Sequence, residues 1–257
     1  MIFLIRKWLP NFIKIPLWGD RVRWGLSVIP DDTCWKKWQK IYTRFYKENQ
    51  RGKLGQWVND AGYKVMNNVD LTGKKILEIG PGDLTHLQYM HGIPKEYVIA
   101  DISKEMMTIA QQSLKKKGVA HKCILLKRNQ KLPIQDNYFD IIINFYSLEH
   151  LYPIEPYLFE IKRVLKPKGL LIGAIPAEGG LSWGLGRALT SRRWLQKNSN
   201  INPDKIICWE HPNFADDILY SLNKIFTRKK IKMWPFPFLP LLDINLVIQL
   251  VYTKPEK

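Results

Sequence analysis

The chain has 257 residues, of which 46% are hydrophobic, and this is enough for one α/β domain with extensions. The three cysteines form no CxxC pair and no zinc-type His/Cys spacing, so we expect neither a disulfide framework nor a metal site, as in a reducing cytoplasm. The net charge of +17 is carried mostly by the two flanks, which would attract an anionic phospholipid, a phosphorylated substrate or a nucleic acid.

Residues 1–70 are predicted to form a basic, aromatic-rich helical extension that acts as a lid on the following domain. About five apolar residues precede Arg6 and Lys7, too few for a signal peptide or a membrane span, so we expect a cytoplasmic chain. Pro10 and Pro16 prevent one long helix, and the mixture of apolar and basic residues is typical of a peripheral anchor on the inner membrane face. The apolar residues of this anchor are Ile2, Phe3, Leu4, Ile5, Trp8, Phe12, Ile13 and Trp18. The alternative is that these residues pack against the domain.

Farther along this extension, Asp31 or Asp32 can cap a helix that carries an aromatic stripe at spacings of three and four residues. Such a stripe is typical of a helix face that packs on a core. Its members are Trp35, Trp38, Tyr42, Phe45 and Tyr46.

From Lys75 onward, apolar runs of strand length alternate with segments of helical period, which is the pattern of a parallel βαβ sheet. Residues 139–145 are nearly all apolar, as in a central strand buried on both faces. We therefore predict a Rossmann-like, doubly wound α/β sheet of about seven strands within residues 71–257. The expected strands are 75–79, 97–100, 121–126, 139–145 and 170–175, and the expected helices are 83–90, 103–117 and 153–166.

The regular pattern stops after Pro176. Residues 177–212 are rich in Gly, Ser and Arg, and a connection of this length is usually functional, so we predict an irregular insertion on the substrate side. A helix is expected again only from about residue 213 to about residue 226. Residues 231–234 and 244–252 could supply two closing strands.

The segment ILEIGPGDL carries the clearest chemical signal. Gly80 and Gly82 let the backbone turn sharply and approach a ligand beside the free N–H groups of the next helix. Asp101 ends the next strand, where a carboxylate can accept hydrogen bonds from both hydroxyls of a ribose. Thr85 stands where a dinucleotide fingerprint requires glycine, and the acid Glu78 precedes the turn, so a single nucleoside is favoured.

Over about residues 74–176 the sequence resembles class I S-adenosylmethionine-dependent methyltransferases, in the type 11 group with the ubiquinone/menaquinone methyltransferases. The resemblance rests on LEIGPG, ADISKEMM, KLPIQDNYFD, SLEHL and RVLKPKG, in the family's order and spacing. It implies S-adenosylmethionine as the cofactor. The implied contacts are Glu78, Gly80, Pro81 and Gly82 for its methionine part, Asp101 for the ribose and Ile102 for the adenine, with Tyr146 as a further contact. A purely helix-capping carboxylate is the alternative for Asp101.

Two positions depart from the family pattern. Leu84 replaces the family's third glycine and could crowd the cofactor, and Arg128 stands near the place of the acid that binds the adenine amino group. Asn129 or Gln130 could accept that hydrogen bond through a side-chain carbonyl. The wider chain also resembles a narrower group found near bacterial surface-polysaccharide genes, which implies a sugar or lipid-linked acceptor.

The candidate reacting groups follow the fourth and fifth strands, because the ligand crevice of such a sheet lies beyond the carboxyl ends of its strands. His150 is the preferred base, His211 is the alternative if the insertion folds back, and Glu149 could orient a histidine or contact the cofactor amine. Glu178 is a further acid on this side. The other histidines, His86, His91 and His121, are expected to be structural or exposed, and Arg187, Arg192 and Arg193 could bind a phosphate-bearing acceptor or form a solvated face.

Three functions are compatible with these residues. The first is O-methylation of a small-molecule, sugar or lipid-linked acceptor. The second is RNA methylation, favoured by the pI of about 9.7 but without a recognisable RNA-binding module, so a nucleic-acid partner is not expected. The third is a non-catalytic, cofactor-binding protein associated with a membrane.

Overall fold

Seven strands form one mixed sheet in the order β3-β2-β1-β4-β5-β7-β6 in the computed structural model, which describes residues 4–127 and 131–256. Neighbouring strands from β3 to β5 are parallel, and β7 is antiparallel to both β5 and β6. This confirms the predicted Rossmann-like sheet. The strands are β1 (Lys75–Ile79), β2 (Glu96–Asp101), β3 (His121–Leu125), β4 (Phe139–Phe145), β5 (Leu165–Pro176), β6 (Thr227–Trp234) and β7 (Val247–Thr253).

The core lies on both faces of this sheet. Because side chains alternate along a strand, Ile141 and Ile143 of β4 enter one buried cluster and Ile142 enters the other. The main covering helices are α5 (Lys104–Lys116), α6 (Ile154–Val164) and α10 (Ala215–Ile225), with short 3-10 turns η4 (Thr85–Tyr89), η5 (Leu148–His150) and η6 (Leu242–Ile244). The Ser103 hydroxyl caps α5 by accepting from the Met106 N–H at 3.2 Å, as expected from the sequence.

The N-terminal extension is helical and is fastened to the insertion. Its elements are η1 (Ile5–Lys7), α1 (Asn11–Trp18), α2 (Arg21–Trp24), α3 (Thr33–Phe45), the π-helical turn η2 (Tyr46–Gln50), α4 (Lys53–Tyr63) and η3 (Lys64–Asn68). Of the two candidate caps, Asp32 caps α3 by accepting from the N–H groups of Cys34 and Trp35. The aromatic stripe of α3 packs in a separate cluster with Leu195 and Trp209.

The prediction of an irregular segment at 177–212 was wrong. Three short helices occupy it, α7 (Leu181–Leu189), α8 (Ser191–Asn198) and α9 (Pro203–Glu210). Each spans only about two turns, so none shows a long apolar period, and such short helices depend on tertiary packing for stability. One local signal was present, because Asn202 caps α9 by accepting from the Asp204 N–H at 2.9 Å and Pro203 occupies its first turn.

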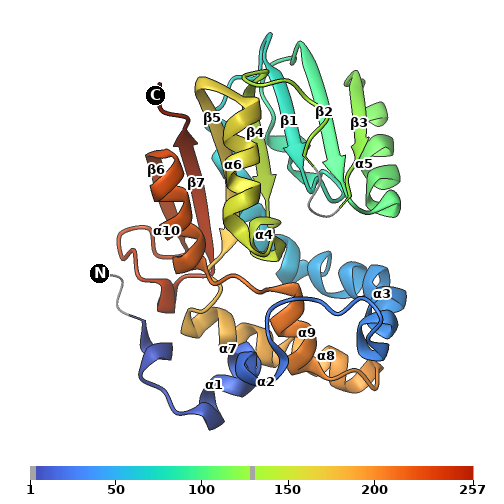
Figure 1. Ribbon diagram of the computed structural model, residues 1–257, viewed down its shortest axis with the longest axis vertical. Helices are drawn as coiled ribbons and strands as arrows, with labels where there is room; N and C mark the ends of the chain where they lie inside the picture. Colours follow the sequence, from blue (N-terminus) through green and yellow to red (C-terminus); the bar gives the residue numbers. More distant parts are fainter. Residues whose placement is uncertain (1–3, 128–130, 257) are drawn as a thin grey trace.

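The helices α1–α3 and α7–α9 gather at one end of the sheet, beyond the carboxyl ends of the parallel strands (Figure 1). This is where a doubly wound sheet binds its ligands. Across residues 4–127 and 131–256, no helix is both long and apolar enough to cross a bilayer.

Candidate active site

The turn after β1 depends on its glycines. Gly80 and Gly82 have φ angles of +67° and +57°, in the left-handed region that side chains rarely adopt. A Cβ atom on Gly80 would lie 2.7 Å from the Cβ of Ser147, so the turn also packs too closely for any side chain there. Pro81 lies between the two glycines, and the turn forms a narrow cradle at the carboxyl end of β1.

Leu84 does not fill this cradle. It adopts the left-handed conformation that glycine would take, with φ of 60°, and its side chain is only 2% exposed within the core cluster that contains Leu87 and Ile99. The departure from the family glycine is therefore absorbed by the core.

Glu78 lies beneath the turn and is fully buried. Its Oε2 accepts from the Tyr97 hydroxyl at 2.5 Å, and its Oε1 lies 3.3 Å from Nε2 of His86, which is itself buried. The carboxylate is thus held between β2 and η4. Its contact with the methionine part of the cofactor stays a prediction.

Asp101 and Ile102 lie at the carboxyl end of β2, next to the glycine turn along the sheet. Asp101 Oδ1 accepts from the Ser103 N–H at 2.7 Å, and burial raises the pKa of this carboxyl. Ile102 is 59% exposed. Their contacts with ribose and adenine stay predictions, and Asn129 and Gln130 lie outside the described residues.

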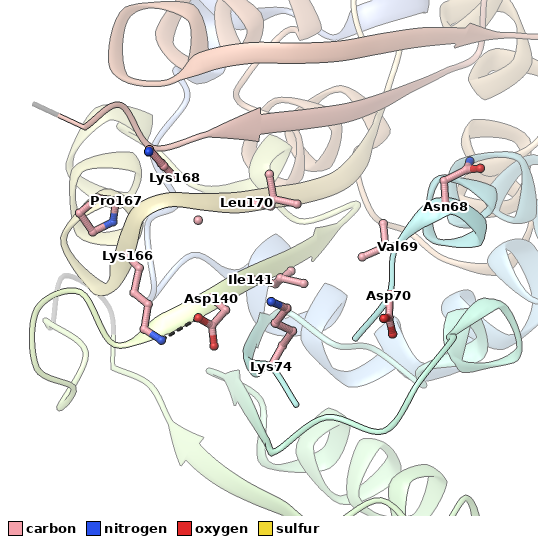
Figure 2. Close-up of a pocket in the computed structure, with 11 residues that line it drawn as sticks. Asn68, Val69, Asp70, Lys74, Asp140, Ile141, Lys166, Pro167, Lys168 and Leu170 are labelled. Atoms are coloured by element: carbon pink, nitrogen blue, oxygen red, sulfur yellow. Dashed lines mark hydrogen bonds and ion pairs between the residues drawn. The ribbon is translucent and has the colours of Figure 1, made fainter. Parts of the chain in front are cut away.

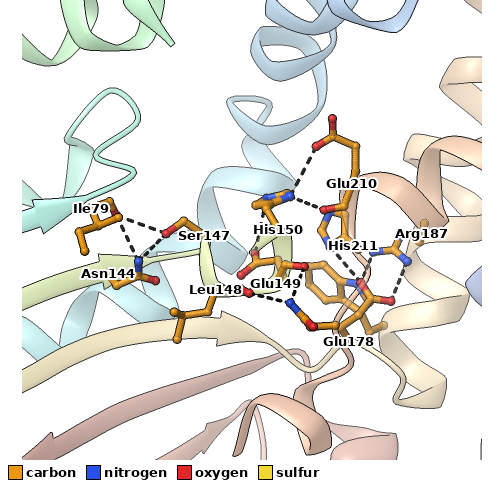
Figure 3. Close-up of polar contacts among 12 residues, drawn as sticks. Ile79, Asn144, Ser147, Leu148, Glu149, His150, Glu178, Arg187, Glu210 and His211 are labelled. Carbon is orange, nitrogen blue, oxygen red and sulfur yellow. Dashed lines mark hydrogen bonds and ion pairs between the residues drawn. The ribbon is translucent and has the colours of Figure 1, made fainter. Parts of the chain in front are cut away.

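Asn144 of β4 and Ser147, which follows the strand, connect its end to β1, and the sequence analysis missed both. The Asn144 side-chain amide donates to the Ile79 carbonyl at 3.2 Å and to the Ser147 hydroxyl at 2.5 Å (Figure 3). The Tyr146 hydroxyl points elsewhere and donates to the Asn59 carbonyl of α4 at 3.0 Å. Tyr146 thereby fastens the N-terminal extension, and its predicted contact with the cofactor is not tested by this arrangement.

Helix α3 and the turn η2 cross over the same edge of the sheet. The Tyr46 hydroxyl lies 3.1 Å from the position of a Cβ on Gly82, and Arg51 donates to that hydroxyl at 2.7 Å while pairing with Asp83. At the other end of α3, the Trp38 ring N–H donates to Glu210 at 2.5 Å. The extension thus contacts the glycine turn and the residue before His211, and its role as a lid stays a prediction. The aromatic stripe indicated a packed face, but nothing in the sequence identified its partners.

The three predicted catalytic residues lie together. His150 from η5 and His211, which follows α9, have ring centroids 4.8 Å apart (Figure 3). The His150 Nδ1–H donates to the Glu210 backbone carbonyl in a short hydrogen bond, and His150 Nε2 lies 4.0 Å from the fully buried Glu149. Asn213 braces this turn by donating to the Leu151 carbonyl at 2.7 Å, a contact that sequence reasoning missed.

Behind His211 lies a buried ion pair between Glu178 and Arg187. His211 Nδ1 is 3.1 Å from Glu178, and the Trp183 ring N–H donates to the same carboxylate at 2.9 Å. Burial acts to raise the pKa of Glu178, but Arg187 and His211 outweigh it and hold that pKa well below its usual range. Burial, with Arg187, lowers the pKa of His211 to about 3, so this histidine is neutral at physiological pH.

The arginines after β5 are not a free cluster. Arg187 is committed to Glu178, and Arg192 pairs with Asp204 at 2.7 Å, whereas Arg193 is exposed. Of the two alternatives, a solvated basic face is wrong for the buried Arg187, and phosphate binding by Arg187 or Arg192 would have to compete with their ion pairs.

Burial of Glu149 leads to a testable effect on stability. Burial raises the pKa of this carboxyl to about 7, above the unfolded value of about 4.3, so the folded chain binds the proton more tightly and loses stability as pH rises through this window. Glu149→Gln is expected to raise the free energy of unfolding by up to about 3 kcal/mol at about pH 8 and to change it little at about pH 4. Urea denaturation at both pH values measures this, and an equal change at both would contradict it.

A cavity of about 380 Å³ lies at the opposite end of the sheet (Figure 2). Its lining includes Asp70, Lys74, Asp140 and Lys166, around the amino ends of β1 and β4. Asp140 there pairs with Lys166 at 2.6 Å and accepts from the Lys75 N–H at 2.8 Å, so its charge is already compensated. The cavity lies at the amino ends of these strands, whereas ligands of such a sheet bind beyond the carboxyl ends.

Comparison with known proteins agrees with this geometry. Residues 77–173 match the family model of a methyltransferase domain. The ubiquinone/menaquinone biosynthesis C-methyltransferase UbiE of Shewanella baltica OS155 is 35% identical over 104 residues, which are 39% of this chain and 41% of that enzyme. The enzyme of the same name from Stutzerimonas stutzeri is 36% identical over 104 residues, with the same coverage. The chain thus spans about two fifths of the length of the curated relatives it matches.

Solved structures share the fold over a longer stretch. A protein from Pyrococcus horikoshii has a TM-score of 0.57 at 18% identity and covers 84% of this chain and 98% of its own. A candidate S-adenosylmethionine-dependent methyltransferase from Listeria monocytogenes has a TM-score of 0.54 at 15% identity and covers 78% of this chain and 100% of its own. The chain carries a class I methyltransferase domain. The chain is thus similar to ubiquinone/menaquinone C-methyltransferases over about two fifths of the length of those enzymes, and this domain and its fold imply S-adenosylmethionine as the cofactor.

Proposed function

We propose that this chain transfers the methyl group of S-adenosylmethionine to a hydroxyl of a small-molecule, sugar or lipid-linked acceptor. The observation that carries the proposal is the placement of His150. Its Nδ1–H is bound by the Glu210 carbonyl, which leaves Nε2 to accept a proton. His150 follows β4 and Asp101 ends β2, and these two parallel strands lie on either side of β1. The candidate base and the candidate ribose ligand therefore share one edge of the sheet.

The residues at this edge fit the cofactor. Gly80 and Gly82 turn the backbone sharply at the carboxyl end of β1, and Ile102 offers an exposed apolar surface for a purine ring. Among the described residues, Glu149 Oε2 is buried without a hydrogen-bond partner, as expected of a group that meets a ligand's hydroxyl or amine. When bound, S-adenosylmethionine supplies an electrophilic methyl group.

In this mechanism the chain positions the acceptor and removes its proton. His150 Nε2 takes the hydroxyl proton as the acceptor oxygen attacks, and Nδ1–H, held by Glu210, stabilises the charged ring. His211 packs edge-on against His150, and because burial lowers the pKa of His211 to about 3, it competes little for this proton. The relatives are named as C-methyltransferases, so an acidic carbon acceptor is the second candidate, and it needs the same proton removal.

The cofactor assignment is tested by Asp101→Ala. Removing the carboxylate should weaken binding of S-adenosylmethionine or its demethylated product by roughly 10- to 150-fold, because charged hydrogen bonds are lost. Isothermal calorimetry measures this. Asp136→Ala is the matched control, since Asp136 precedes β4 at the opposite edge of the sheet and its side chain is 68% exposed. Absence of binding by the intact, folded chain would refute the assignment, and methyl transfer to one RNA species at enzyme-like rates would favour the RNA alternative.

A further inference from the structure

Large apolar side chains are exposed at the end of the sheet that carries the candidate active site, on two segments far apart in the sequence. Trp8 and Phe12, around the start of α1, are 78% and 77% exposed. The loop 235–241 joins β6 to β7 and exposes a second group. Its members are Phe236 at 50%, Phe238 at 94%, Leu239 at 54% and Leu241 at 47%. These six side chains are called the apolar rim below.

The two segments of the apolar rim are tied to each other. The buried carboxylate of Asp243, just after the loop, accepts from the Ile5 N–H at 2.9 Å and from the Leu181 N–H of α7 at 3.0 Å. Figure 1 shows the N-terminal segment beside the loop between β6 and β7. Because β7 is antiparallel to both β5 and β6, β6 ends at the same edge as β5. The rim therefore borders the side of the sheet where the acceptor is expected.

The loop holds its shape without help from solvent. The fully buried Asn245 donates to the Leu239 and Leu241 carbonyls at 2.8 and 2.9 Å and accepts from the Phe236 N–H at 2.8 Å. The N–H groups of Leu239 and Leu241 bond within the loop. The loop also contains three prolines, which have no N–H: Pro235, Pro237 and Pro240. Most backbone N–H groups of the loop are thus absent or already bonded, which lowers the cost of moving these groups out of water.

Basic side chains flank the rim. Lys7 is exposed on the N-terminal side, and Lys232 is exposed near the end of β6, the strand that leads into the loop. No acidic residue occurs in residues 227–241 or 4–14. An apolar surface whose backbone N–H groups are mostly bonded or absent, with basic residues at its border, matches an anionic lipid interface, where headgroups meet the cations and acyl chains meet the apolar side chains.

We propose that the apolar rim docks this chain on anionic lipid bilayers. The proposal refines the sequence expectation, because Leu4 and Trp18 are buried and belong to the core rather than to the anchor. Arg6 is likewise committed to Asp216 at 2.7 Å. A truncation through residue 18 would therefore damage the fold, and point substitutions are the sharper test.

The test is flotation of the full chain with vesicles of phosphatidylcholine containing about one quarter phosphatidylglycerol, at about 0.1 M and about 0.5 M NaCl. We expect binding at low salt that weakens at high salt and is weak on pure phosphatidylcholine. Trp8→Ser with Phe12→Ser, and separately Phe238→Ser with Leu239→Ser, should each lower the partition coefficient at least about tenfold. Ile93→Ser is the control, since Ile93 is 83% exposed and lies before β2 at the opposite edge.

Unchanged partitioning of both double variants would overturn the proposal, as would equal loss in the control. Sedimentation of the unliganded chain tests the alternative that the apolar rim binds a second copy of the chain. A dimer that Phe238→Ser dissociates, with no vesicle binding, would assign the rim to a second copy and also overturn the proposal. Circular dichroism verifies folding of each variant, and calorimetry with S-adenosylmethionine reports separately on the proposed function.

Discussion

Replacing His150 with alanine is expected to lower kcat by about 10²- to 10⁴-fold while the Kd for S-adenosylmethionine stays nearly unchanged. The reason is that the Glu210 carbonyl binds Nδ1–H of His150, which leaves the Nε2 lone pair to take the proton of the acceptor in the proposed mechanism. His211→Ala should cost less, because the pKa of His211 is lowered to about 3 and the ring is a weak base. The measurement is steady-state transfer from labelled cofactor, once an acceptor has been found by screening.

His91→Ala is the matched control for this experiment, because His91 is exposed and precedes β2 at the far edge of the sheet. A larger loss for His211→Ala would assign the base to His211 instead. Near-normal turnover of both variants would exclude both histidines and leave positioning, or a carboxylate such as Glu149 or Glu178, to account for catalysis.

The sequence predicted the parts of the site that follow directly from strand ends. Glu149 and His150 come just after β4, and Asp101 ends β2, so the rule that ligands bind beyond the carboxyl ends of strands placed them without a structure. The strands themselves were predictable because continuous apolar runs in a βαβ pattern are typical of buried parallel strands.

What the sequence could not predict depends on contacts between distant segments. Trp38 meets Glu210, and Arg51 meets Asp83, only because α3 folds over the sheet edge. No local period or cap encodes which side chain an aromatic stripe will face. The helices α7–α9 were missed for the same reason, since their stability comes from packing on α1 and α3 rather than from long periodic sequences.

Arg187 shows how far a local interpretation can differ from the folded state. In the sequence it is one of three arginines near glycines, and a solvated face or a phosphate site are both reasonable interpretations. In the structure its side chain is 6% exposed against a fully buried Glu178. The charge that looked available for a substrate instead holds a carboxylate beside His211.

Arg187→Met is expected to lower the free energy of unfolding by about 3–5 kcal/mol at neutral pH, because it leaves the buried Glu178 carboxylate without its partner. The double variant Arg187→Met/Glu178→Gln should recover much of this loss, since removing both charges avoids an uncompensated buried ion. Urea denaturation of the two variants and the parent chain measures the difference. Lys166→Met is the control, because Lys166 also forms an ion pair, with Asp140, but its side chain is 40% exposed.

The Glu178–Arg187 ion pair also makes the stability loss of Arg187→Met depend on pH. The pKa of Glu178 is held below its unfolded value of about 4.3, so the stability that the pair contributes is complete above that value and is lost as pH falls toward the folded pKa. The difference in the free energy of unfolding between the parent chain and Arg187→Met should therefore be largest near neutral pH and should decrease below about pH 4. A difference that stays constant from neutral to acidic pH would show that Arg187 stabilises the fold by packing and not by its charge.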